Sequence, residues 1–258
     1  MSNHKRFASK CALVTGASSG IGRATARRLA EEGADVVAVG RRLERLEEVV
    51  RELKSSGARA VAVAGDVREA AVCDRAVTTA IEHFGGLDSL VHAAGVIGSG
   101  SLADTTSDEW DRVMDSNLKS IFLLTRRAAP ELAKRRGAIV SISSVASIRP
   151  YANLTPYCVS KAALDMFTKC AALEYAPAGV RVNAVNPGVV VTELHTVANA
   201  VPDYPGFLEH SKSTHPLGRV GAPEEIAALV VYLLSEEAGW ITGATYSIDG
   251  GRALVSAR

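Results

Sequence analysis

The stretch Thr15-Gly16-Ala17-Ser18-Ser19-Gly20-Ile21-Gly22 follows a short apolar run, CALVT (11–15), and leads directly into an amphipathic segment. A glycine turn between a strand and a helix presents backbone N–H groups and the positive helix end to a phosphate. Gly16 would permit the tight turn, Gly20 the close approach of a pyrophosphate, and Gly22 close helix–strand packing. The spacing is Gly-x-x-x-Gly-x-Gly, which differs from the common Gly-x-Gly-x-x-Gly fingerprint. The stretch therefore predicts a dinucleotide-binding turn; the alternative is a glycine-rich turn without a ligand.

Apolar runs of strand type alternate with longer amphipathic segments along the whole chain. The expected strands are 11–15, 35–39, 60–64, 89–93, 138–143, 180–185 and 244–248, and the expected helices include 21–32, 42–56, 69–84, 117–135, 157–176 and 223–235. Strands that are apolar without strict alternation are typical of a parallel sheet covered on both faces. The sequence predicts an α/β protein with a doubly wound (Rossmann) parallel seven-stranded sheet. Because no linker or composition break interrupts the chain, we expect residues 1–258 to form a single domain.

One long irregular region is expected at 189–216, and it contains HTVANAVPDYPGFLEHSKSTHP. Its length, prolines and aromatic residues favour a mobile lid over a site. The alternative is a tolerated surface insertion.

Composition excludes several classes of protein. The formal net charge of +1 argues against a nucleic-acid or anionic-membrane partner that binds through bulk charge. No stretch approaches the roughly 20 apolar residues of a membrane span, and the polar N-terminus leaves no room for the apolar segment of a signal peptide. The four cysteines are scattered without Cys-x-x-Cys spacing, so they indicate reduced thiols in a cytoplasmic protein and no metal site.

The residues after the second expected strand bear on the cofactor. An acidic residue about 20 positions beyond the glycines would accept the ribose 2′-hydroxyl of NAD. Here Gly40-Arg41-Arg42 occupies that place, and arginine pairs well with a 2′-phosphate. The sequence therefore favours NADP(H), with NAD(H) as second choice. The alternative is that both arginines only open a solvated helix.

Tyr157 and Lys161 lie four residues apart in an expected helix, so they share one face. A tyrosine hydroxyl normally keeps its proton until about pH 10, and a neighbouring ammonium favours the phenolate. The pair predicts a general acid/base, although the spacing alone also occurs by chance on ordinary helices.

Taken together, these elements resemble the short-chain dehydrogenase/reductase family, in its single-domain, 3-oxoacyl reductase-like branch. The resemblance covers nearly the whole chain, from Lys10 to about Gly251, and its motifs occur in the family's order. It implies cofactor contacts at Gly16, Ser18, Ser19, Gly20, Ile21, Gly22, Arg41, Arg42, Asp66, Val67, Ala93, Gly95, Tyr157, Lys161, Pro187, Gly188, Val190 and Thr192. The segment His92-Ala93-Ala94-Gly95 departs from the family's Asn-Asn-Ala-Gly pattern, since both asparagines are replaced.

The resemblance also implies a catalytic set of Asn117, Ser144, Tyr157 and Lys161. Tyr157 would be the acid/base, and Ser144 would polarise the carbonyl oxygen of the substrate. Lys161 would bind the nicotinamide ribose and lower the pKa of the tyrosine, and Asn117 would hold a water that links Lys161 to solvent. Ser143 is the neighbouring alternative to Ser144, which the family's usual spacing favours. The alternatives are loop or helix capping for Ser144, Asn117 and Thr192, and His92 is expected to be a satisfied core-edge histidine.

The expected substrate contacts are Ser144, Val145, Tyr151, Tyr157 and Leu194, with Arg149, His195, Tyr204 and Phe207 as further candidates. Such a pocket suits a small-molecule ketone, a 3-oxoacyl thioester, a quinone-like ring or a sugar. In this family the helices corresponding to 116–135 and 157–176 commonly build a dimer interface, so we expect a homotetramer, with a dimer as second choice. Ile121, Phe122, Leu124 and Ala128 are the apolar residues expected to supply part of that surface.

Overall fold

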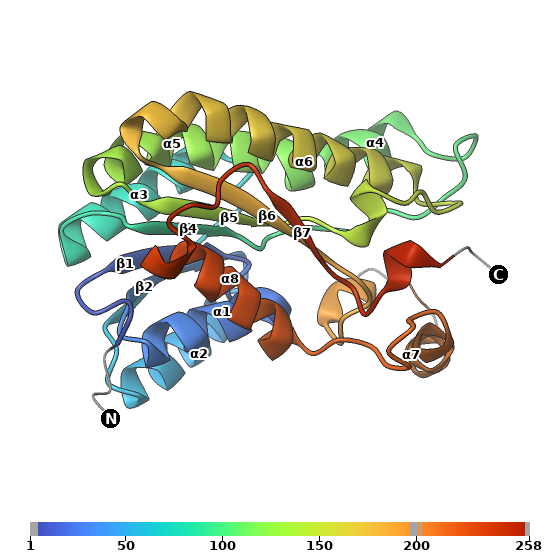
Figure 1. Ribbon diagram of the computed structural model, residues 1–258, viewed down its shortest axis with the longest axis horizontal. Coiled ribbons are helices and arrows are strands. Elements are labelled where there is room, and N and C mark those ends of the chain that lie inside the picture. Colours follow the sequence, from blue (N-terminus) through green and yellow to red (C-terminus); the bar gives the residue numbers. More distant parts are fainter. Residues whose placement is uncertain (1–4, 197–200, 202, 256–258) are drawn as a thin grey trace.

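The seven strands of the described residues form one sheet, and every pairing of neighbouring strands is parallel (Figure 1). The computed structural model describes residues 5–196, 201 and 203–255. The strands are β1 (Cys11–Thr15), β2 (Asp35–Gly40), β3 (Ala60–Ala64), β4 (Ser89–His92), β5 (Ala138–Ile142), β6 (Arg181–Pro187) and β7 (Thr245–Ile248). Their order, β3-β2-β1-β4-β5-β6-β7, confirms the predicted doubly wound (Rossmann) fold in a single domain.

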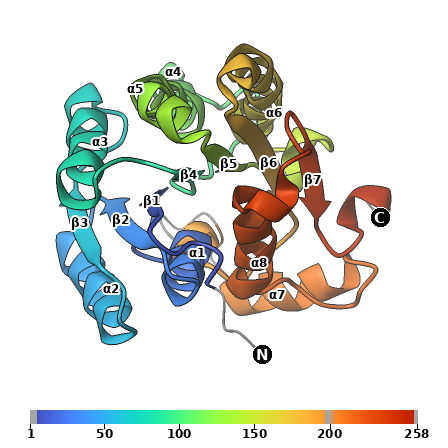
Figure 2. The same ribbon diagram turned by 60° about the vertical axis from the view of Figure 1, so that its left-hand side comes forward.

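Helices cover both faces of the sheet (Figures 1 and 2). One layer holds α1 (Gly20–Glu31), α2 (Leu43–Ser55) and α8 (Pro223–Leu234), and the other holds α3 (Ala70–Phe84), α5 (Ser120–Arg135) and α6 (Thr155–Tyr175). Within β1, Ala12 and Val14 pack into the first layer, whereas Cys11 and Leu13 pack into the second. All five residues of β1 are buried because both of its faces are covered, and this explains its apolar sequence without alternation.

A helical run that begins before residue 117 was not expected. It consists of α4 (Ser107–Met114) and a π-helical turn, η1 (Asp115–Lys119), which continue directly into α5. The Thr106 side chain accepts a 3.2 Å hydrogen bond from the Glu109 amide, so this cap and the acidic first turn were the missed signals. Asn117 lies inside the run and is fully buried, so it does not cap a helix, contrary to one of the alternatives.

The region 189–216 is more regular than the sequence predicts. It contains a short 3-10 helix, η4 (Glu193–His195), and a helix, α7 (Tyr204–Ser213). The Asp203 carboxylate caps α7 by accepting a 3.0 Å hydrogen bond from the Gly206 amide, which explains where this helix begins. Residues 197–200 and 202 lie outside the described residues, as does the side chain of His195. A lid function for 189–216 remains a prediction.

The apolar surface expected on α5 is largely core. Ile121, Leu124 and Ala128 are at most 2% exposed, and only Phe122 reaches solvent, at 45%. The packing of α5 against α3 and the sheet accounts for the buried residues. An exposed apolar face occurs instead on α6, where Val159, Met166 and Leu173 recur every seven residues. This spacing places the three side chains on one side of the helix.

All four cysteines are free in the structure, and Cys11 and Cys73 are buried. Within the described part of the chain, no helix has the length and apolar character needed to cross a membrane.

Candidate active site

A cavity of about 500 Å³ lies at the carboxyl ends of the strands. Its wall comes from the loops that follow β1 to β6, and it lies where the connections after β1 and β4 leave toward opposite faces of the sheet. Ligands of doubly wound proteins commonly bind at such a switch point. Every residue predicted to contact the cofactor lines this cavity: Gly16, Ser18, Ser19, Gly20, Ile21, Gly22, Arg41, Arg42, Asp66, Val67, Ala93, Gly95, Tyr157, Lys161, Pro187, Gly188, Val190 and Thr192.

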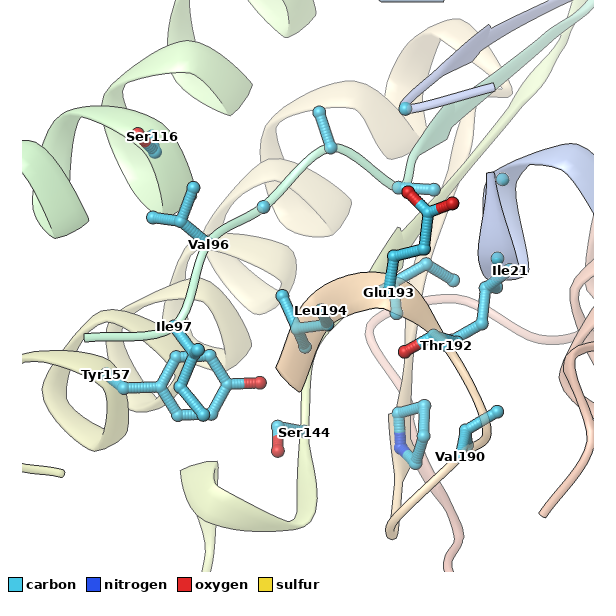
Figure 3. A pocket seen from close by; sticks show the side chains of 18 of the residues that line it. Ile21, Val96, Ile97, Ser116, Ser144, Tyr157, Val190, Thr192, Glu193 and Leu194 are labelled. Atoms are coloured by element: carbon cyan, nitrogen blue, oxygen red, sulfur yellow. The ribbon is translucent and has the colours of Figure 1, made fainter. Parts of the chain in front are cut away.

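The residues predicted to contact the substrate lie in the same cavity. Ser144, Val145, Tyr151 and Leu194 line it together with Tyr157, and so does Phe207. Figure 3 shows Tyr157 on α6, Ser144 after β5 and Leu194 on η4 around one space, together with Val96 and Ile97 of the loop after β4.

Among the predicted residues whose side chains the structure describes, three do not line the cavity: Asn117, Arg149 and Tyr204. The Tyr204 hydroxyl donates to the carbonyl of Thr192 (3.1 Å) and accepts from its amide (3.2 Å). Tyr204 therefore supports the backbone of Thr192 from outside the cavity and does not point at a substrate. The Thr192 side chain does not cap η4, because this short helix has no side-chain cap hydrogen bond.

The glycine turn offers an anion site at the N-terminus of α1. No side chain caps this helix, and its first turn carries no acidic residue. A Cβ at Gly16 would lie 2.6 Å from the carbonyl oxygen of Ala93, and one at Gly22 would lie 2.3 Å from the carbonyl oxygen of Gly16. The backbone is thus tightly packed, and uncapped N–H groups at a positive helix end face the cavity. These features fit the pyrophosphate of a dinucleotide.

Arg42 folds back over this turn. Its guanidinium donates to the hydroxyl groups of Ser18 (3.2 Å) and Ser19 (3.1 Å), and to the carboxylate of Glu193 (2.9 Å). Arg45 pairs with the other oxygen of Glu193. Arg42 therefore does more than open a solvated helix, and Arg41 lines the cavity beside it.

Asp66 lies in the loop after β3 and forms an ion pair with Arg68, with 2.7 Å between the guanidinium and the carboxylate. The hydrogen bond from this guanidinium holds the pKa of Asp66 below its ordinary value, while burial acts in the opposite direction. The carboxylate is thus ionised at neutral pH and available as an acceptor at this end of the cavity.

Gly188 lies where the chain leaves β6, and a Cβ at this position would lie 2.8 Å from His215 Nε2. His215 Nδ1 donates to the Ser211 carbonyl (2.6 Å), and its Nε2 accepts from the Val189 amide (3.1 Å). Burial lowers the pKa of His215, with a smaller opposing effect from the Ser211 hydrogen bond. A neutral histidine therefore fixes the backbone at this wall of the cavity.

Tyr157 and Ser144 form the reactive pair of the cavity. Both side chains are nearly buried and line the same cavity, Tyr157 from α6 and Ser144 from the loop after β5. Burial raises the pKa of Tyr157 above its ordinary value, and the nearby Ser144 hydroxyl acts against this rise. The Ser144 oxygen also accepts a 3.1 Å hydrogen bond from the Ala146 amide, so it caps the following turn as well.

Lys161 lies one turn after Tyr157 on α6, and its ammonium nitrogen is 5.7 Å from the centroid of the tyrosine ring. Burial lowers the pKa of Lys161 to about 8, and the Asp165 carboxylate opposes this change. In the protein alone, burial therefore dominates the pKa of both residues, and the expected lowering of the tyrosine pKa is not seen. Further positive potential next to the ring, such as an oxidised nicotinamide, would be needed to produce it.

Sequence reasoning missed several residues of the cavity wall. They are Gly65, Arg68, Val96, Ile97, Ser99, Arg112, Ser116, Leu154, Val201 and Arg252. Val96 and Ile97 directly follow the quoted Ala93–Gly95 segment, so their position in the loop was a usable signal. Arg252 had no such signal, because only the folded chain brings the C-terminal turn beside the loop after β5.

Comparison with known proteins bears on what this cavity does. A family model described as enoyl-(acyl carrier protein) reductase matches residues 16–253. Dehydrogenase/reductase SDR family member 4 of Bos taurus is 41% identical over 253 residues, which cover 97% of this chain and 90% of that protein. This chain belongs to the short-chain dehydrogenase/reductase family. It is also similar to 2,5-dichloro-2,5-cyclohexadiene-1,4-diol dehydrogenase LinX of Sphingobium indicum, at 40% identity over 95% of this chain and 97% of the relative.

Among solved structures, this short-chain dehydrogenase/reductase is similar to L-sorbose reductase from Gluconobacter frateurii, which was crystallised with NADPH and L-sorbose. The TM-score is 0.90 with 34% sequence identity, and the match covers 98% of this chain and 100% of that one. The protein is therefore an oxidoreductase whose fold binds a nicotinamide dinucleotide, and the predicted family is confirmed.

Proposed function

We propose that this protein is an NADP(H)-dependent carbonyl reductase that transfers a hydride between the nicotinamide and a ketone or secondary alcohol. The observation that carries the proposal is that Tyr157 and Ser144 lie together in the same cavity as the glycine turn. The proposal covers four classes of substrate: a small ketone, a 3-oxoacyl thioester, a quinone-like ring and a sugar.

Each residue of the predicted set has a distinct task in this proposal. A bound nicotinamide dinucleotide supplies or accepts the hydride. Tyr157 donates a proton to the substrate oxygen as negative charge develops, or removes it in the reverse direction. The Ser144 hydroxyl donates to the same oxygen and stabilises that charge. Lys161 holds positive charge one turn away on α6, where it would bind the nicotinamide ribose of a bound cofactor.

Asn117 does not line the cavity, so it supports this chemistry indirectly. Its amide donates to the Val96 carbonyl (2.9 Å) and to the Ser160 hydroxyl (3.0 Å), and its oxygen accepts from the Val96 amide (2.9 Å). We assign Asn117 a positioning role on this basis; the predicted water between Lys161 and solvent stays a prediction.

The central test replaces Tyr157 by Phe. The substitution removes the proton donor and keeps the ring, so we expect turnover to fall by about 10²–10⁴-fold while cofactor affinity is retained. NADPH consumption with a panel of ketones measures turnover, and fluorescence titration measures affinity. Turnover that survives in Tyr157→Phe would contradict the mechanism. A parent protein that binds the cofactor tightly but reduces no carbonyl would instead support a non-catalytic dinucleotide sensor.

The preference for NADP(H) rests on Arg41 and Arg42 at the end of the cavity near the glycine turn. One observation favours the alternative, an NAD-dependent alcohol, sugar or hydroxysteroid dehydrogenase: Glu193 already pairs with Arg42. Affinities for NADPH and NADH in the parent, in Arg41→Ala and in Arg42→Ala separate the two. We expect each variant to lose NADPH affinity and keep NADH affinity. Equal affinities in the parent would refute the NADP(H) assignment.

We also propose a homotetramer in which the exposed apolar face of α6 meets a second copy. Val159, Met166 and Leu173 are 39%, 58% and 79% exposed, and a contiguous apolar face of this kind is typical of a protein interface. Light scattering on the parent and on Leu173→Glu tests this assembly. A stable monomer at micromolar concentration would contradict it, and a dimer is the second choice.

A further inference from the structure

The cationic side chains of the cavity wall fall into two groups. Arg42 pairs with Glu193, Arg68 with Asp66, and Arg112 with Glu109. Arg41, Lys161 and Arg252 form no ion pair with a carboxylate of the described residues. Arg41 lies at the proposed 2′-phosphate site and Lys161 lies beside Tyr157. The unpaired charge of Arg252 therefore requires a separate explanation.

Arg252 belongs to the substrate part of the cavity. Its Nε donates a 3.0 Å hydrogen bond to the hydroxyl of Tyr151, a predicted substrate contact, and its Nη1 donates to Thr214 at the end of α7. Its guanidinium carbon lies 5.2 Å from the centroid of the Tyr151 ring. The guanidinium is therefore held by segments far apart in sequence, and such fixed placement lowers the entropy lost on binding an anion.

Two donors at this point have no partner among the described residues: Nη2 of Arg252 and the O–H of Tyr151. The nearest carboxylate along the chain, Asp249, is already engaged by the amides of Gly251 (3.0 Å) and Ala253 (2.7 Å). A half-buried guanidinium with unused donors favours an anionic ligand, and carboxylates match its planar geometry.

The candidate anion partner predicted from the sequence, Arg149, has a different position. It does not line the cavity, and its Nη1 donates a 2.6 Å hydrogen bond to the carbonyl oxygen of Arg252. Its guanidinium also lies over the Tyr151 ring, 5.5 Å from the centroid. Arg149 thus supports the C-terminal turn that presents Arg252.

The rest of this part of the wall is apolar, with Ile97, Val145, Leu154, Leu194 and Phe207. We propose that Arg252, together with the Tyr151 hydroxyl, binds a carboxylate of the substrate, so that the substrate is a ketone or secondary alcohol with an apolar body and an acidic group. This inference rests on the proposed carbonyl reductase function and names its substrate class.

Matched pairs of ketones test the inference: 4-acetylbenzoate with its methyl ester, and 5-oxohexanoate with its ethyl ester. We expect kcat/KM with NADPH or NADH to be about 10- to 100-fold higher for each acid than for its ester, from a lower KM. Equal values for acid and ester overturn the inference and leave the carbonyl reductase proposal intact. If neither member of either pair is reduced while the cofactor binds, the proposed function fails and the inference fails with it.

Two variants separate recognition of the anion from support of the fold. Arg252→Met keeps the aliphatic bulk and removes the charge, so the ratio of kcat/KM for acid over ester should fall at least about tenfold. Arg252→Lys should restore part of that ratio. Arg51→Met is the matched control, because it removes an exposed guanidinium on α2 that does not line the cavity, and it should leave the ratio of kcat/KM for acid over ester unchanged. If Arg252→Met changes kcat/KM for the acid and for the ester by the same factor, the inference is overturned.

Discussion

Asn117 and Val96 exchange two hydrogen bonds of 2.9 Å, in which the side-chain amide of Asn117 pairs with the backbone N–H and C=O of Val96. The pairing is like that of two adjacent strands, but one partner is a side chain. Since Asn117 also donates to Ser160 on α6, a single residue joins the loop after β4 to the helix that carries Tyr157. The π-helical turn at 115–119 places Asn117 in the interior, and such turns are frequent at functional sites.

Replacing Asn117 by Ala should therefore affect both stability and turnover. The backbone groups of Val96 would lose their partners, and we expect unfolding free energy to fall by about 1–3 kcal/mol in urea denaturation. The kcat should fall as well, because the loop beside Tyr157 loses its anchor. Ser160→Ala is the control: it removes one of the three hydrogen bonds and should cost only about 1 kcal/mol. A fully stable Asn117→Ala protein would show that the pairing with Val96 contributes little.

The structure gives the hydroxyl groups of the adjacent residues Ser143 and Ser144 different surroundings. The Ser144 side chain lies near Tyr157 in the cavity (Figure 3), whereas the Ser143 hydroxyl donates to the Lys161 carbonyl at 3.3 Å. We expect Ser144→Ala to lower kcat by about 10²–10³-fold, as for loss of one oxyanion donor, and Ser143→Ala to lower it far less. Steady-state kinetics on both variants with one ketone decides the matter. The reverse order of effects would assign the polarising role to Ser143.

His92 should make the protein sensitive to acid. Burial lowers the pKa of His92 to about 3, whereas a histidine in the unfolded chain titrates near 6.5. Between these values the unfolded state binds more protons, so this contribution to stability is complete above about pH 6.5 and declines as pH falls toward 3. Each pH unit in this window removes roughly 1.4 kcal/mol.

The His92→Asn variant tests this prediction. It removes the titrating group but keeps polar atoms near Thr125, whose hydroxyl lies 2.9 Å from His92 Nε2. Urea denaturation of both proteins between pH 4 and 6.5 gives the two slopes of stability against pH. The slope of stability against pH should be smaller for the variant by roughly 1.4 kcal/mol per pH unit, which corresponds to one proton. Identical slopes would mean that His92 does not titrate in this way.

Gly16 and Gly57 allow a matched test of the dinucleotide turn. Both have positive φ, +65° and +88°, but a Cβ at Gly57 would meet no atom within 4 Å. Gly57→Ala should therefore cost only the strain of the left-handed backbone, about 1–2 kcal/mol. Gly16→Ala adds a clash with the backbone at Ala93 and should also abolish binding of NADPH or NADH. Thermal unfolding and fluorescence titration measure the two effects; retained cofactor binding in Gly16→Ala would contradict the assigned turn.

Local features of the sequence were enough to predict the fold and most of the cavity wall. The strands follow from apolar runs, and the glycine turn follows from residues adjacent in the chain. In a parallel sheet the carboxyl ends of successive strands meet at one edge, so residues just after each strand were bound to converge. The family resemblance predicted Asp66, Gly95, Ser144 and Gly188 as site residues, and this rule explains why they line one cavity with Gly16.

The contacts between distant segments were decided only by tertiary structure. The inward turn of Asn117, the pairing of Arg42 with Glu193 across 151 residues, and the approach of Arg252 to Tyr151 across 101 residues have no local signature. The pKa values of Tyr157 and Lys161 also depend on burial, which follows from packing and not from their spacing. The sequence alone determined the reaction class through residues close to the strand ends. Folding decided which charges stay unpaired in the cavity, because each side chain finds its partner only when distant segments come together.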